Sequence, residues 1–335
     1  MNTATYLPVA QAGVPLLLWG APGSGKSAMV HHWTRGRHMH CETLIGSLSD
    51  SGDVIGFAVQ DGGSVRFALP EWFTRLGSSG SAGVLFLDEI NRGTRAVRSA
   101  MLRIIAERSI HGHTLPEHVA VVGAANDDGD VDDMDGAMLS RFCHLAHQPD
   151  ALSWVRQTRG GDWDLPGTLP QTWKDHLPVH AEMVCQFVAA RPELLHKVSG
   201  RTDLRGSTCP RTWTMLARGL AACASLSIEP APIVVGLVGD GAAKEYRAWA
   251  KQLDIPPPEQ VLAGKWKPGQ RDQQRAALLS IVPLIRTPDT WDAAWEQVAR
   301  CHKDVAVLAA RHIAPRRPAG SATPLSAAVL IDVLR

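Results

Sequence analysis

The chain has 335 residues, a length that usually divides into two packed units. Hydrophobic residues make up 45% and charged residues 20%, which argues against a disordered or fibrous protein. The 34 basic and 33 acidic side chains leave a formal net charge of +1, so bulk charge provides no attraction to nucleic acid or to acidic membranes.

The cysteines and the N-terminus give no sign of secretion or of a metal framework. The six cysteines include no C-x-x-C pair, which argues against disulfide bonding and a thiolate zinc site. His31, His32, His38 and His40 lie near Cys41 but lack a third and fourth ligand at zinc-finger spacing, which argues against a zinc site. No basic region precedes an apolar run at the N-terminus, and the longest apolar runs have strand length. We expect a cytoplasmic protein without a membrane-inserted segment.

Residues 1–149 alternate short apolar runs with helical stretches, a pattern that predicts an α/β domain with a parallel sheet. Near-continuous apolar runs over Leu16–Trp19, Val84–Asp88 and Val119–Ala125 are typical of central strands buried on both faces. Between the last two, Arg95–Arg108 has helical periodicity and predicts a surface helix against the sheet.

After Pro149 the strand-like runs nearly vanish and helical stretches punctuated by proline follow. This change predicts a mainly helical second domain over residues 150–313. Apolar and histidine positions repeat every three to four residues from Asp289 to His312, which predicts one long helix. Residues 314–335 are predicted to form a connector and a C-terminal helix.

A glycine-rich loop carries the clearest chemical signal. It matches the P-loop pattern G-x-x-x-x-G-K-[ST], also called Walker A, after an apolar strand and at the start of a helix. Its backbone N–H groups are expected to surround the β-phosphate of ATP, Lys26 to reach the β- and γ-phosphates, and Ser27 to coordinate Mg²⁺. The predicted nucleotide-binding residues are Gly20, Ala21, Pro22, Gly23, Ser24, Gly25, Lys26, Ser27 and Ala28.

Two carboxylates, Asp88 and Glu89, end the apolar run that begins at Val84 and form a Walker B pattern. Ligands bind at the carboxyl ends of parallel strands. We expect Asp88 to hold Mg²⁺ and Glu89 to polarise the water that attacks the γ-phosphate. A strand ending in Asp-Glu is more often structural, but its pairing with the phosphate loop favours the catalytic role.

Asn126 and Arg141 extend the candidate site. Asn126 ends the run over Val119–Ala125 and could present its amide to the attacking water, although a capping asparagine is the alternative. Arg141 could enter a neighbouring subunit's site to stabilise transition-state charge, although an ordinary surface ion pair would also explain an arginine there.

With these elements in order, the chain resembles AAA+ ATPases of the MoxR branch, the relatives of magnesium-chelatase ATPase subunits. The resemblance covers about residues 14–146 and includes the family's L-D-E-I-N-[RK] run and its A-[LM]-x-[SD]-R-F run. The segments that carry it are Asp53–Gly56, Leu87–Arg92, the short hairpin from Glu107–Ile110 to Leu115–Pro116, and Ala137–Phe142.

The resemblance continues more weakly into the helical part. Cys209–Trp213 is similar to the S-P-R-[ST] sensor-2 segment, which implies that Arg211 reads the γ-phosphate, with a helix N-terminal ion pair as the alternative. Gly236–Tyr246 resembles a lid stretch of MoxR-type proteins often encoded beside proteins with von Willebrand factor A-like domains. The insertion Trp154–Trp173 and the residues beyond about 265 resemble nothing we recognise.

The family resemblance implies a P-loop NTPase sheet of the AAA+ type followed by a helical lid. It also implies a homo-oligomeric ring, usually a hexamer, that spends ATP to remodel a partner carrying a von Willebrand factor A-like domain. In this reading Glu89, Asn126, Arg141 and Arg211 are catalytic. Two alternatives stay open: an ATP-gated assembly scaffold with slow hydrolysis, and a DNA-acting loader, which the neutral net charge disfavours.

Overall fold

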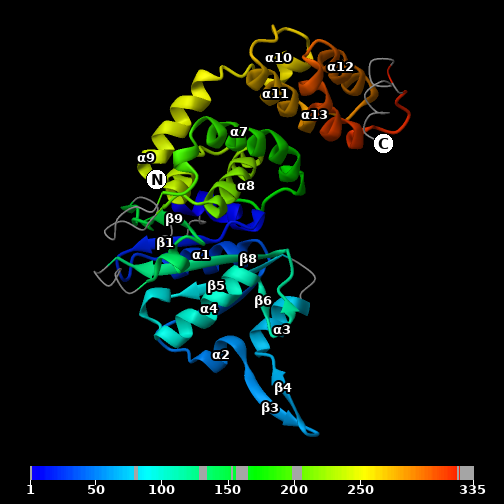
Figure 1. Cartoon of the computed structure of the whole chain (residues 1–335). Helices are drawn as coiled ribbons and strands as arrows, with labels where there is room; N and C mark the ends of the chain where they lie inside the picture. The colour runs from blue at the N-terminus through cyan, green and yellow to red at the C-terminus, as the bar shows by residue number, and fades with distance from the viewer. Residues whose placement is uncertain are drawn as a thin grey trace.

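A computed structural model gives the fold of the chain (Figure 1). None of the helices it describes is long and apolar enough to cross a membrane. The structure describes residues 2–78, 82–127, 134–151, 154–155, 165–197, 206–322 and 324.

Five parallel strands form the central sheet in the order β2-β5-β8-β1-β9. Their pairing puts the ends of three strands at one edge, since Gly20 of β1 pairs with Asn126 of β8, and Leu87 of β5 with Gly123 of β8. The three strands predicted from apolar runs are confirmed as β1, β5 and β8, and the expected α/β fold with a parallel sheet is confirmed with them. The strands are β1 (Leu16–Gly20), β2 (His40–Ile45), β5 (Gly83–Asp88), β8 (Val119–Asn126) and β9 (Cys143–Ala146).

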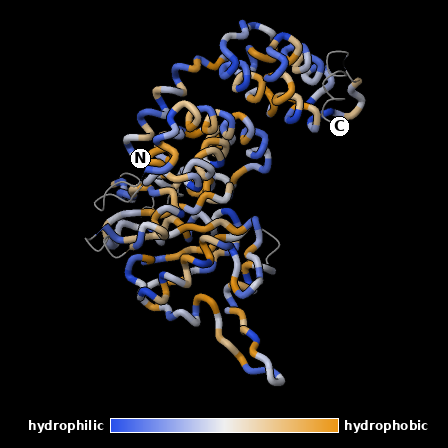
Figure 2. Tube along the Cα trace, in the orientation of Figure 1, coloured by the Kyte–Doolittle hydropathy of each residue, from blue (hydrophilic) through white to orange (hydrophobic). Residues whose placement is uncertain are grey.

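Successive side chains along a strand point to opposite faces, so both faces of this sheet have an apolar layer. On β1, Leu16 and Leu18 pack into one hydrophobic cluster, whereas Leu17 and Trp19 pack into a second. The need to bury both faces explains why the strands are continuous apolar runs in the sequence, as Figure 2 shows along the sheet.

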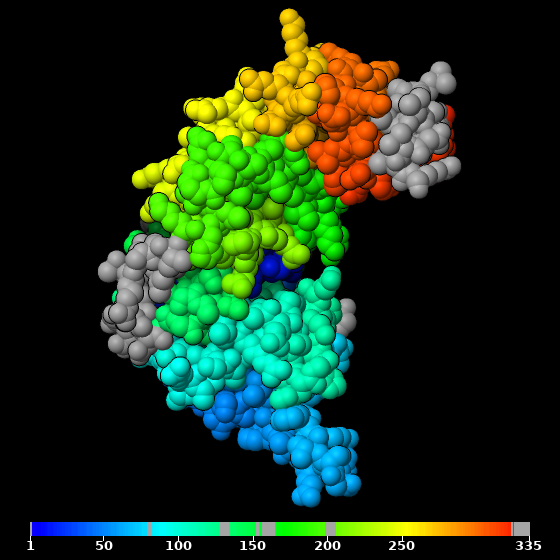
Figure 3. Space-filling model, viewed as in Figure 1, coloured from blue at the N-terminus to red at the C-terminus, as the bar shows by residue number. Residues whose placement is uncertain are grey.

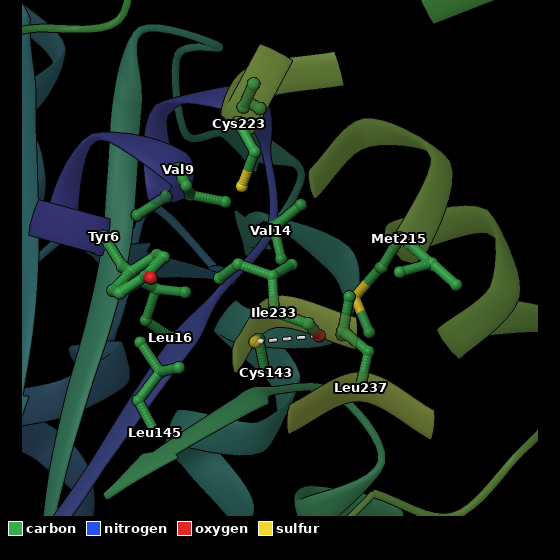
Figure 4. Packing of buried hydrophobic residues seen from close by; sticks show 14 of the residues in the cluster. Tyr6, Val9, Val14, Leu16, Cys143, Leu145, Met215, Cys223, Ile233 and Leu237 are labelled. Atoms are coloured by element: carbon green, nitrogen blue, oxygen red, sulfur yellow. Dashed lines mark hydrogen bonds between the residues drawn. The ribbon is translucent and has the colours of Figure 1, made fainter. Parts of the chain in front are cut away.

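The first cluster joins the sheet to helices from the N-terminus and from the second half of the chain (Figure 4). In it, Tyr6 and Val9 of an N-terminal 3-10 helix contact the same core as Met215 and Leu237. The α/β half and the helices of the second half of the chain therefore share one core. The elements on this face are η1 (Thr3–Ala12), α1 (Lys26–Gly36), η4 (Gln171–His176), α7 (Leu177–Ala190), η5 (Pro192–Leu194), α8 (Pro210–Leu226) and α9 (Ala231–Gln252).

The second cluster covers the other face of the sheet with helices and one short hairpin. The surface helix predicted over Arg95–Arg108 is confirmed as α4, with Val97, Met101, Ile104 and Ile105 buried. The predicted short hairpin after it is also present, as β6 and β7. The elements are α2 (Ser51–Ile55), α3 (Glu71–Ser78), η2 (Ile90–Arg92), α4 (Arg95–Glu107), β6 (Ser109–Ile110), β7 (His113–Thr114) and α5 (Gly136–Leu139).

A further hairpin, β3 (Phe57–Asp61) with β4 (Ser64–Ala68), was not predicted and projects away from the body of the protein (Figures 1 and 3). Its base is attached because the Phe67 ring stacks on the His111 ring, with centroids 3.7 Å apart. Its length nevertheless exposes large apolar side chains, unlike the strands of the sheet. These are Phe57 (61% exposed), Val59 (46%), Val65 (65%) and Phe67 (48%).

The C-terminal helices build a third cluster of their own around Trp266, Trp291 and Trp295. The single long helix predicted over Asp289–His312 is wrong, because the chain forms two helices there. His302 adopts an extended conformation (φ −60°, ψ 143°), and its ring nitrogen accepts a hydrogen bond from the Asp304 N–H, which starts a new helix. The elements are α10 (Pro258–Leu262), α11 (Arg271–Ser280), η6 (Val282–Leu284), α12 (Pro288–Ala299), α13 (Lys303–Ile313) and η7 (Ala314–Arg316).

Two predictions fall largely outside the described residues. The predicted C-terminal helix would lie in residues 325–335, and residues 156–164 make up the centre of the insertion that begins at Trp154.

Helix α9 approaches the edge strand β9 at Gly236. A Cβ atom added to Gly236 would lie 2.3 Å from the His144 carbonyl oxygen and 2.9 Å from the Cys143 sulfur. The Cys143 thiol also lies 3.8 Å from the Ile233 carbonyl of the same helix (Figure 4). Gly236 therefore sets how closely the lid can pack on the sheet.

We expect Gly236→Ala to lower the free energy of unfolding by about 1–3 kcal/mol, because the new methyl group collides with backbone that cannot move cheaply. Gly241→Ala is the matched control, since it lies in α9 just beyond the non-helical Gly239 (φ 76°) and its added Cβ meets nothing within 4 Å. That control should be neutral or stabilising by up to about 1 kcal/mol, from helix propensity. Urea unfolding measures both, and equal effects of the two variants would contradict the close contact.

Candidate nucleotide-binding site

The phosphate loop connects the end of β1 to the start of α1. Its turn requires a left-handed backbone at Gly23 (φ 74°) and Gly25 (φ 92°), which glycine adopts without steric cost. Helix α1 then begins at Lys26, so its free N–H groups and its positive dipole end face the loop. The strand–loop–helix context predicted for this motif is present.

Lys26 is buried, with 6% of its surface exposed, at the centre of the site. Its ammonium group donates to the carbonyl oxygens of Gly20 (2.7 Å) and Ala21 (3.0 Å) and to the amide oxygen of Asn126 (3.1 Å). The structure thus joins the phosphate loop to Asn126, a residue 100 positions further along the chain.

Ser27 and Asp88 also meet, as their hydroxyl oxygen and carboxylate oxygen Oδ2 are 2.6 Å apart. The other carboxylate oxygen of Asp88 accepts from the Glu89 N–H at 2.9 Å, which fixes the orientation of the group. A hydroxyl and a carboxylate side by side are hard oxygen ligands, and Mg²⁺ typically takes one or two such protein ligands besides water and phosphate. The residues therefore fit a magnesium ion bound together with a triphosphate.

Glu89 has a left-handed backbone (φ 49°, ψ 39°), uncommon for a residue other than glycine. Its carboxylate accepts a hydrogen bond from the Ser47 hydroxyl. Ser47 lies just beyond β2, whose last residue Ile45 pairs with Asp88. Sequence analysis missed Ser47, since only the strand order brings the end of β2 beside the end of β5.

Asn126 is held by a second buried asparagine, Asn91. The Asn91 side chain accepts from the Asn126 N–H (3.2 Å) and donates to the Asn126 carbonyl (3.1 Å). This two-point contact fixes the backbone of Asn126 so that its side-chain oxygen faces Lys26. Asn91 stands within the Leu87–Arg92 run that carries the family resemblance, but nothing in the run assigned it a role.

Arg141 and Arg211 lie away from the residues grouped around Lys26. Arg141 precedes β9, whose first residue pairs with Leu16 at the amino edge of the sheet, while the phosphate loop begins beyond Gly20 at the carboxyl edge. A strand rise of about 3.3 Å per residue separates these edges by roughly 13 Å. Arg211 is the second residue of α8 and donates to the Ser140 hydroxyl at 3.1 Å. The structure therefore groups Lys26, Ser27, Asp88, Glu89 and Asn126 at one edge, with Arg141 and Arg211 apart from them.

The positive charge of Arg211 affects the pKa of Arg141. Burial lowers the pKa of the Arg141 guanidinium, and the positive charge of Arg211 lowers it further, while Asp135 acts in the opposite direction. Arg141 donates to the Ala137 carbonyl, but its Nε is buried and has no hydrogen-bond partner among the described residues. Two guanidinium groups close together form a site that attracts an anion.

Comparison with known proteins agrees with this geometry. Residues 15–142 match the family model of the AAA domain, dynein-related subfamily. A solved structure of a candidate ATPase from Cytophaga hutchinsonii ATCC 33406 is similar to this chain in fold, with a TM-score of 0.50 and 16% sequence identity. The match covers 76% of this chain and 89% of that one. A comparison with curated proteins gives no match.

The chain therefore contains a domain of the AAA type over residues 15–142. Its phosphate loop, acidic strand end and sensor-like asparagine lie within the matched residues. A mainly helical region follows the domain.

We expect Asn91→Ala to slow ATP turnover about tenfold or more, since the amide of Asn126 would lose the support that aims it, and displacement of a catalytic group has large effects. The free energy of unfolding should also fall by about 1–3 kcal/mol, because the buried N–H and C=O of Asn126 would lose their partners. Steady-state turnover and urea unfolding are the measurements. An Asn91→Ala enzyme with parental turnover would show that Asn126 needs no such support.

Proposed function

We propose that this protein is a MoxR-like ATPase that hydrolyses ATP between the subunits of a ring, and that it remodels or activates a partner protein. The observation that carries the proposal is the contact of Ser27 with Asp88, beside Lys26, Glu89 and Asn126, at one sheet edge. These residue types are the ones that phosphoryl transfer to water requires.

Each residue has a distinct part in the reaction. The loop N–H groups and Lys26 would bind the phosphates, and Ser27 and Asp88 would hold Mg²⁺, which when bound neutralises phosphate charge. Glu89 would accept a proton from the attacking water. Asn126 would orient that water through its side-chain amide, which Asn91 positions.

The position of the arginines supports hydrolysis at contacts between subunits. Arg141 and Arg211 lie at the amino end of β9, away from the phosphate loop of their own chain. We propose that both reach the ATP of a neighbouring subunit, where Arg141 would stabilise the charge of the transition state and Arg211 would contact the γ-phosphate. A closed ring, here taken as a hexamer, supplies such a neighbour for every site.

The exposed β3–β4 hairpin supports a protein as the partner. Its apolar side chains Phe57, Val59, Val65 and Phe67 suit a protein surface better than a phosphate backbone. Following the family resemblance, we propose a partner with a von Willebrand factor A-like domain. A scaffold that used hydrolysis only as a timer would turn over slowly in every mixture, whereas a remodelling ATPase accelerates with its partner.

Two substitutions separate ATP binding from hydrolysis. We expect Glu89→Gln to bind ATP as the parent does and to lower kcat by about 10² to 10⁴, because the amide cannot take the proton. Lys26→Ala should lose nucleotide binding itself. Titration with a fluorescent ATP analogue and a phosphate-release assay measure the two effects. Parental turnover by Glu89→Gln would show that another group is the base.

Mixing two inactive variants tests whether Arg141 acts on a neighbour. Lys26→Ala subunits keep Arg141, and Arg141→Ala subunits keep an intact nucleotide site. We therefore expect each variant alone to be inactive and their mixture to regain part of the parental turnover. Replacing the first variant with a Lys26→Ala, Arg141→Ala double variant is the control, and it should restore nothing. If mixed rings form, as native mass spectrometry can show, and turnover stays absent at every ratio, Arg141 does not act in trans.

A further inference from the structure

His147 follows β9 directly and packs its backbone against the start of the phosphate loop. Its N–H donates to the Trp19 carbonyl at 2.6 Å, which extends the pairing of β9 with β1 by one residue. Its own carbonyl lies so close to Gly20 that an added Cβ there would be 2.5 Å away. The position of the His147 ring is therefore set by the sheet.

The ring reaches the middle of the loop. Its Nε2 atom is 3.0 Å from the carbonyl oxygen of Ser24. A carbonyl oxygen only accepts, so Nε2 carries the proton and donates it. The other nitrogen, Nδ1, is buried and has no hydrogen-bond partner among the residues that the structure describes.

The charge state of the His147 ring is consistent with a neutral ring that donates through Nε2. Burial lowers the pKa of His147, the hydrogen bond to Ser24 raises it, and the positive charge of Lys26 lowers it again. The net shift is downward, so the ring is neutral at neutral pH and donates through Nε2.

The hydrogen bond has a consequence for the inner side of the loop. The Ser24 C=O and the Gly25 N–H belong to one planar trans peptide unit and point in opposite directions. With the Ser24 carbonyl directed at His147, the Gly25 N–H is directed away from His147. Gly25 has a left-handed backbone, a conformation in which successive N–H groups converge on an anion.

We propose that His147 is a positioning residue for ATP binding, which holds the Ser24–Gly25 peptide unit with its N–H directed at the phosphates. This inference rests on the proposed function, because it concerns the same loop. It assigns a role to a residue that belongs neither to the glycine-rich motif, nor to the Asp88–Glu89 pair, nor to the arginine pair. The chemistry required at position 147 is one N–H donor at the place of Nε2.

Three substitutions at His147 test the inference. Leucine removes the N–H donor. Asparagine keeps a polar side chain, but its amide is too short to reach Ser24. Glutamine is one methylene longer and carries an amide N–H near the position of Nε2. We expect His147→Leu and His147→Asn to weaken binding of MgATP by about 3- to 10-fold, the usual effect of losing one hydrogen bond. His147→Gln should bind within about twofold of the parent. The exposed neighbour Gln148→Ala is the matched control and should bind as the parent does.

Binding is measured with a fluorescent ATP analogue, and KM and kcat with a phosphate-release assay, for every variant that shows a parental thermal transition. The expected pattern is a raised Kd and KM, with kcat at saturating ATP within about twofold of the parent, in the two variants without a donor at the Nε2 position. Parental affinity in His147→Asn or His147→Leu would overturn the inference. So would a glutamine variant as weak as the asparagine variant. Failure of the proposed function would look different, since the parent itself would then bind no ATP.

Discussion

The parallel pairing of β1, β5 and β8 is the constraint on which the site depends. A parallel sheet brings the carboxyl ends of its strands to one edge, and here those ends carry the phosphate loop, Asp88 and Asn126. Such a sheet must be covered on both faces, because its strands are apolar on both sides. The chain meets this need with α3 and α4 on one face and with α1 and the lid helices on the other. The helices of the second half are thus part of the core that holds the site in shape.

The hydrogen bonds of Lys26 explain how its ammonium group can be buried and still bind a phosphate. A buried charge without partners would be strongly destabilising, but here two carbonyl oxygens and one amide oxygen accept from it. These three oxygens are neutral, and hydrogen bonds to charged oxygens are roughly twice as strong. The oxygens of a triphosphate would therefore attract the ammonium group more strongly than these three do. The same reasoning applies to Ser27, whose hydroxyl already lies against the carboxylate of Asp88.

The sequence made the elements of the site predictable wherever a local pattern decides the structure. The glycines of the phosphate loop, the apolar runs of three strands and the carboxylates after one of them are all local features, and they appear as predicted. Contacts between distant segments were beyond sequence reasoning: Ser47 meets Glu89, and Asn91 clamps Asn126, only because of the strand order. The β3–β4 hairpin was overlooked although it carries a local signal, since apolar residues alternate on both sides of Gly62–Gly63. The long helix predicted after Asp289 was wrong because His302 caps a new helix while the apolar repeat continues into it.

The edge strand β9 connects the two parts of the proposed ATPase cycle. Its carboxyl end leads into His147, which contacts the phosphate loop of its own chain, and its amino end follows Arg141, which we propose acts on the next subunit. Helix α9 packs on the same strand at Gly236, and Arg211 in the first turn of α8 donates to Ser140. A packed strand of four residues transmits small displacements because close-packed interiors do not deform continuously. A shift of the phosphate loop on ATP binding would therefore reach α9 and the arginine pair through this one strand. In the ring that we propose, β9 would then couple neighbouring sites.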